Sequence, residues 1–159
     1  MLPSETADPS LDLLRAFFAA SAAARRATRL ISGDARVDLV LDGGFAHFTH
    51  EDGTADVRHG TSGRPDFTLT LPRAAVERLT ARDAADVGEL GVAFFELALE
   101  RDPALRIRIH LEAPTARLIA HGYLAVVALG GVKVAWWLVK NGIGHPRAAL
   151  ERLRRATGR

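Results

Sequence analysis

The apolar residues near the start of the chain recur every three or four positions, at Leu11, Leu14, Phe17 and Phe18. This spacing places them on one side of a helix, and Ser10 before them can serve as its N-cap. The pattern therefore predicts an amphipathic helix that begins after Ser10 and ends near Gly33. Residues 1–9 have no such periodicity, and we expect a disordered leader there.

The period changes to two after residue 36, which is typical of strands. A strand is predicted at 37–43, and an Asp52-Gly53 turn within 45–60 predicts a hairpin in which His50 pairs with Ala55 and Phe48 with Val57. Two later segments alternate apolar and polar residues in the same way, DFTLTLP (66–72) and LRIRIHL (105–111).

Two helices are predicted between these last two strands. The first contains Ala75, Val76 and Leu79. The second follows a cap at Asp83 or Asp86 and has an apolar stripe formed by Val87, Leu90, Phe94 and Leu97. The order of the elements predicts an α+β fold, in which a largely antiparallel sheet is covered by helices on one face.

The longest apolar run of the chain is Leu118 to Val139. A helix that is apolar on all sides must be buried in protein core, in lipid or against an apolar ligand. Lys133 lies inside the run and disfavours a membrane span, because a central Lys costs about 3 kcal/mol to insert. Gly130-Gly131 is a natural break, so we expect two helices folded over the sheet. Their surplus apolar surface indicates a cavity, a partner or a membrane contact.

Composition and residue spacing limit the functions that the chain can have. The 159 residues fit a single domain, residues 10–159, and the absence of Cys excludes disulfides and Cys-ligated zinc.

His47 and His50 are three apart on a predicted strand and point to opposite faces, so no metal site is expected. A basic C-terminal helix after Pro146 has no aromatic residue, which argues against nucleic-acid binding and leaves contact with an anionic membrane surface open. The first ten residues do not form a secretory signal, so a cytoplasmic location is expected.

Three segments, in their order along the chain, resemble the sterol carrier protein 2-like family: VDLVLDG with the hairpin after it, DFTLTLPRAAVERL, and AFFELAL followed by LRIRIHLEA. The resemblance covers about residues 37–142. It implies a mixed sheet of about five strands covered by helices, with an apolar tunnel that holds sterols, fatty acids, fatty acyl-CoA or similar lipids. Members of the family act as carriers or accessory domains without catalysis or a cofactor.

The resulting hypothesis is non-catalytic binding or transfer of a lipid. The residues expected at the ligand are Phe94, Phe95, Leu118, His121, Tyr123, Val127, Trp136 and Trp137. His121 either is a satisfied core residue or bonds a headgroup. Trp136 and Trp137 point about 100° apart on a helix, so either one lies at a lipid headgroup interface or both fill the core. The alternative function is a membrane-associated or partner-binding accessory protein that docks through residues 118–139.

Overall fold

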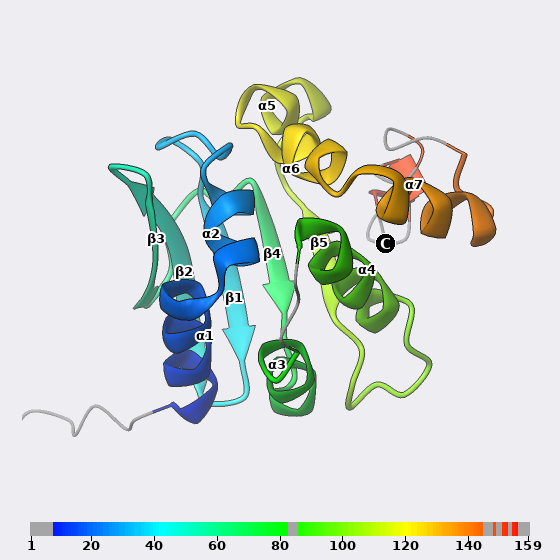
Figure 1. The fold of residues 1–159 in the computed structure, drawn as a ribbon. Coiled ribbons are helices and arrows are strands. Elements are labelled where there is room, and N and C mark those ends of the chain that lie inside the picture. The colour runs from blue at the N-terminus through cyan, green and yellow to red at the C-terminus, as the bar shows by residue number, and fades with distance from the viewer. Residues whose placement is uncertain (1–7, 83–85, 145–147, 149–150, 153, 156–159) are drawn as a thin grey trace, which may run out of the picture.

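Five strands form one mixed sheet in the order β3-β2-β1-β4-β5 (Figure 1). The computed structural model describes residues 8–82, 86–144, 148, 151–152 and 154–155. The parallel pair is β1 and β4, and the other neighbours are antiparallel. The strands are β1 (Val37–Leu41), β2 (Gly44–Glu51), β3 (Thr54–His59), β4 (Phe67–Thr70) and β5 (Arg108–Leu111).

The helices gather on one face of this sheet (Figure 1). They are α1 (Pro9–Ala20), α2 (Ala22–Thr28), α3 (Arg73–Thr80), α4 (Val87–Ala98), α5 (Thr115–Ala120), α6 (Tyr123–Leu129) and α7 (Gly131–Lys140). The α+β class and the mixed, mostly antiparallel five-stranded sheet are confirmed. The predicted start of a C-terminal helix at Pro146 lies outside the described residues, although residues 148, 151–152 and 154–155 are helical.

The hairpin has the predicted register. His50 pairs with Ala55 and Phe48 with Val57. Asp52 and Gly53 both have positive φ, at 50° and 77°, as a tight two-residue hairpin turn requires. The fifth strand is shorter than the alternating pattern suggested, because the backbone N–H of Ile107 donates to Leu97 at the end of α4 instead of to a strand.

The N-terminal helical segment differs from its prediction at both ends and in the middle. It begins at Pro9, and its N-cap is Asp8, whose carboxylate accepts the backbone N–H of Ser10 at 2.9 Å. Residues 1–7 of the predicted leader lie outside the described residues. Ser21 divides the segment, ending α1 and capping α2 by accepting the N–H of Ala24 at 3.1 Å. The last turn of α2 ends at Thr28, before the predicted end near Gly33, and Gly33 does not take the left-handed conformation that often ends a helix.

Replacing Ser21 by Ala is expected to lower the free energy of unfolding by about 1 kcal/mol, because the first turn of α2 then has no side-chain acceptor. Ser21→Asn is the matched control, since it keeps a side-chain acceptor at the start of α2 and adds no charge at the end of α1. Urea unfolding followed by circular dichroism measures both variants. Equal stability of Ser21→Ala and the parent chain would contradict this role of Ser21.

The long apolar segment contains three helices, not two. The expected break at Gly130-Gly131 is present, and α6 and α7 are bent by 95° there. A second break at Gly122 was not predicted. Gly122 has a φ of 89°, and a Cβ on it would overlap the carbonyl group of Leu30, so only glycine fits this close approach. Within the described residues, no single helix is long and apolar enough to cross a membrane. Only α6 and α7 taken together, as a bent pair, have the length and apolar composition of a span.

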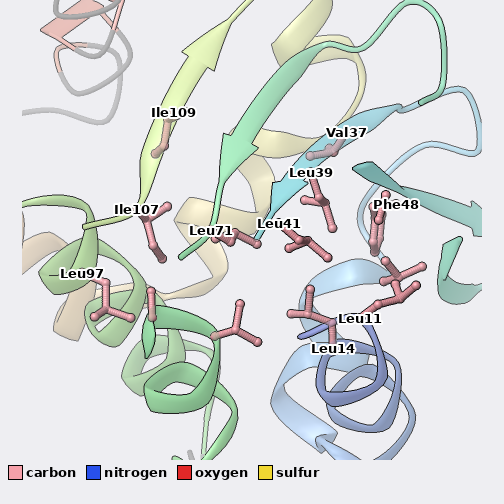
Figure 2. Packing of buried hydrophobic residues seen from close by; sticks show 14 residues of the cluster. Leu11, Leu14, Val37, Leu39, Leu41, Phe48, Leu71, Leu97, Ile107 and Ile109 are labelled. Carbon is pink, nitrogen blue, oxygen red and sulfur yellow. The ribbon is translucent and has the colours of Figure 1, made fainter. Parts of the chain in front are cut away.

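The main core lies between the sheet and the helices. Figure 2 shows Leu11 and Leu14 of α1 pointing toward Leu41 and Phe48 of the sheet. Elsewhere in the same core, Leu97 of α4 lies near Ile107 before β5. A second, smaller cluster holds α7 in place and consists of the buried residues Val134, Leu138 and Ile143.

Candidate functional site

An apolar cavity of 340 Å³ lies between the inner face of the sheet and the helices. Every sheet strand except β3 contributes to its wall, together with side chains from all seven helices. Among the described residues, no charged side chain lines it; Thr28 and Tyr123 carry its only polar side-chain groups. Its volume is within the range of about 300–1,000 Å³ typical of small-molecule sites.

The interior strand β4, which lies between β1 and β5, shows that this space is not filled by protein. A strand flanked on both sides and covered by helices is normally the best-buried part of a sheet, yet no residue of β4 is fully buried. Its inward-facing Phe67 and Leu69 are half-buried because they face the cavity. These two side chains therefore keep apolar surface available to a ligand.

Helix α4 forms the opposite wall because it packs on other helices, chiefly α7 and α2, and stands away from the strands. Two glycines on α4 allow that packing. A Cβ on Gly88 would lie 2.7 Å from the carbonyl oxygen of Gly130, and one on Gly91 would lie 2.9 Å from a methyl group of Val134. The small residues let α7 approach α4 closely, and the space under α4 remains open.

Five of the residues expected at the ligand line the cavity: Phe94, Phe95, Leu118, Tyr123 and Val127. Trp136 does not, because its side chain is 61% exposed on the outer side of α7. Trp137 does not either; its ring stacks on Phe95 with centroids 5.7 Å apart, on the side away from the cavity. The inward positions of α7 are occupied by Val134 and Leu138, which leaves both indoles outside.

A buried carboxylate lies immediately before β4, at the end of the cavity where Tyr123 is found. Asp66 is 0% exposed. Its Oδ2 accepts the hydroxyl of Tyr123 at 2.8 Å, lies 2.6 Å from Nδ1 of His121, and accepts the backbone N–H of Arg36 at 3.3 Å. Its Oδ1 accepts no well-aligned hydrogen bond, but Nε of Arg117 lies 3.0 Å away and balances the charge.

These contacts fasten the α5–α6 segment to the sheet. Arg117, His121 and Tyr123 all come from that segment or the turn within it, and all three meet the same carboxylate. The backbone of Asp66 also accepts the N–H groups of Glu112 and Ala113 after β5. His121 is thus held by Asp66 and is absent from the cavity wall, contrary to the expectation that it contacts the ligand; of its two alternatives, the satisfied interior residue agrees with the structure.

Tyr123 joins this cluster to the cavity. Its ring packs edge-on against Phe67 with centroids 4.9 Å apart, while its hydroxyl donates to Asp66. Burial, and then the hydrogen bond to Asp66, raise the pKa of Tyr123 well above that of a free tyrosine. An unfolded tyrosine loses its proton near pH 10, whereas the folded one retains it. This contribution to stability is full below about pH 10 and decreases as the pH rises further.

Tyr123 is the one tyrosine of the chain, so tyrosinate absorbance reports it alone. We expect the folded protein to show no tyrosinate signal between pH 10 and 11, and the signal to appear on unfolding in urea at the same pH. A reversible titration near pH 10 with the fold intact by circular dichroism would contradict the buried hydrogen bond to Asp66.

The sequence gives little sign of Asp66. An acidic residue beside Pro65, at the start of an alternating strand, is ordinary loop chemistry, and its partners are 30 to 57 positions away. The described residues contain no group of three or more His, Asp or Glu side chains arranged to hold a metal ion.

Comparison with known proteins adds a distant likeness. No protein-family model matches the chain, and no curated protein matches it. A solved structure described as "UbiJ-SCP2 Ubiquinone synthesis protein" is similar over 76% of this chain and 90% of that one, with 16% identity and a TM-score of 0.40. At this distance the likeness carries no conclusion about activity.

Proposed function

We propose that this protein binds a lipid in the cavity between its sheet and its helices, without catalysing a reaction. The observation that carries the proposal is the half-buried inner face of β4, which lines 340 Å³ of apolar space. Water gains no hydrogen bonds from these apolar walls, so an apolar ligand would replace it favourably beside Phe67 and Leu69. The resemblance of residues 37–142 to sterol carrier proteins supports the same class of ligand.

The energetics favour a ligand with an apolar chain or ring system. Each buried methylene contributes about 0.8 kcal/mol. About ten of them would contribute roughly 8 kcal/mol, which corresponds to a micromolar Kd before the cost of ordering the ligand. An ionised headgroup would have to stay at the surface, because the described lining offers it no charged partner.

A carrier role also agrees with the polar residues nearby. His121 and Tyr123 are each within hydrogen-bonding distance of Asp66, and these contacts hold α5 and α6 in position. None of the described residues that line the cavity supplies a nucleophile paired with a base. We therefore assign the cluster a structural role, that of positioning one wall of the binding site.

Titration of the delipidated protein with a fluorescent long-chain fatty acid tests the proposal. We expect saturable uptake at one ligand per chain, with a Kd in the micromolar range, and displacement by unlabelled lipid. Absence of uptake by the folded protein, together with absence of any co-purified apolar molecule, would overturn it.

A further inference from the structure

Helix α7 has an apolar face that no described residue covers. Val132, Trp136 and Val139 are 80%, 61% and 63% exposed, respectively. Their spacing of four and then three residues puts them on one side of the helix, opposite the buried Val134 and Leu138. Single exposed apolar residues are ordinary, but a stripe that contains a tryptophan marks a contact surface.

The surroundings of this stripe suit a lipid headgroup region. Nζ of Lys140 lies 5.8 Å from the centre of the Trp136 ring. Lys133 lies about one turn before Trp136, and its ammonium group is held by Asp86 at 2.7 Å and Glu89 at 3.2 Å. These contacts orient α7 against α4 and balance the charge of Lys133 locally. Tryptophan and lysine together are the side chains that favour the boundary between water and hydrocarbon.

The charge of the chain is distributed unevenly along its sequence. Residues 131–159 contain seven Lys and Arg and one Glu, whereas residues 1–130 contain fourteen Lys and Arg and eighteen Asp and Glu. Two of the seven cations, Lys133 and Lys140, belong to α7 itself. A nearly neutral chain thus has a positive C-terminal part that includes the helix with the apolar stripe.

A groove of 640 Å³ runs along this face between α4 and α7. Its wall combines both indoles with Arg82, Lys133 and Lys140, and Glu89 is also part of it. Lys133 is paired with Asp86 and Glu89, and Arg82 with Glu96 at 3.3 Å, so Lys140 beside the Trp136 ring is the cation best placed to meet a lipid phosphate.

We propose that the outer face of α7 docks on an anionic bilayer surface, with Trp136 in the headgroup layer and Lys140 beside it at the lipid phosphates. The excess of positive charge favours an anionic membrane over a protein surface of mixed charge. The proposal deepens the proposed function, since Val134 on the inner side of α7 lines the cavity and docking would bring that wall to the source of lipid.

Flotation with vesicles tests this, using phosphatidylcholine with 30% phosphatidylglycerol against phosphatidylcholine alone. We expect the full chain to partition at least tenfold more strongly onto the anionic vesicles, and Trp136→Glu to lose at least tenfold of that binding. Phe45→Glu is the matched control: Phe45 is 57% exposed, but it lies on β2, on the sheet face away from the helices, and its replacement should leave binding unchanged.

The proposal would be overturned by equal binding to the two kinds of vesicle, or by equal losses of vesicle binding in Trp136→Glu and Phe45→Glu. A concentration-dependent dimer in gel filtration that Trp136→Glu abolishes would also overturn it, because the stripe would then belong to an interface with a second copy of the chain. Fatty-acid uptake by Trp136→Glu is measured in parallel. Retained uptake with lost flotation separates a failure of docking from a failure of the cavity.

Discussion

Asp66→Asn is expected to lower the free energy of unfolding by about 3 kcal/mol. The amide keeps the shape of the side chain but replaces one acceptor oxygen by an NH₂ group, which cannot accept from Tyr123 or His121. It also removes the charge opposite Arg117. Because Arg117 is 43% exposed, water can solvate its charge, so we expect the lower end of the range for breaking a buried pair. Urea unfolding followed by circular dichroism gives the value.

Two variants isolate this effect. Tyr123→Phe removes a single donor to Asp66 and should cost about 1 kcal/mol. Asp38→Asn changes another buried carboxylate, which accepts the backbone N–H of Ser62 at 2.8 Å. This variant should also lower the free energy of unfolding by about 1 kcal/mol. If Asp66→Asn cost no more than Asp38→Asn, the convergence on Asp66 would not be what holds α5 and α6 to the sheet.

Leu69→Trp is expected to weaken fatty-acid binding about 30-fold while leaving the protein as stable as the parent chain, or slightly more stable. The larger side chain would enter the cavity and displace two or three methylene groups of the ligand, at about 0.8 kcal/mol each. Overfilling a packed core costs about 1–3 kcal/mol, whereas filling a void does not. Fatty-acid titration and urea unfolding measure the two effects on the same preparation.

Thr70→Trp is the matched control for this substitution. Thr70 is the next residue on β4, is also half-buried, and points to the opposite face of the sheet. The same residue introduced there should leave the Kd unchanged. A loss of several kcal/mol of stability in Leu69→Trp would show that no empty space lies beside Leu69.

The sequence predicts the fold well where local chemistry decides it. The Asp52-Gly53 turn determines the hairpin register, and alternation along 66–72 determines which side of β4 faces inward. The break at Ser21 rests on a local cap of Ala24 that the apolar periodicity does not indicate, whereas the break at Gly122 depends on a contact made on folding. Gly122 needs its left-handed conformation only because the carbonyl of Leu30 lies against it.

The site was predictable in part for the same reason. Phe94 belongs to an apolar stripe that must face the sheet, so its place at the cavity follows from periodicity. The positions of Trp136 and Trp137 do not, because a helix that is apolar on all sides gives no indication of which side packs inward. Asp66 was missed because its role comes from groups that are far from it in the sequence.

Native mass spectrometry of the gently purified protein, with lipid extraction from the same sample, tests the binding function most directly. The proposed function predicts one apolar molecule per chain in the parent protein and in Thr70→Trp, and its depletion in Leu69→Trp. A parent protein that carries no such molecule and takes up none when lipid is supplied, or a Leu69→Trp variant that retains a full complement, would contradict lipid binding in this cavity.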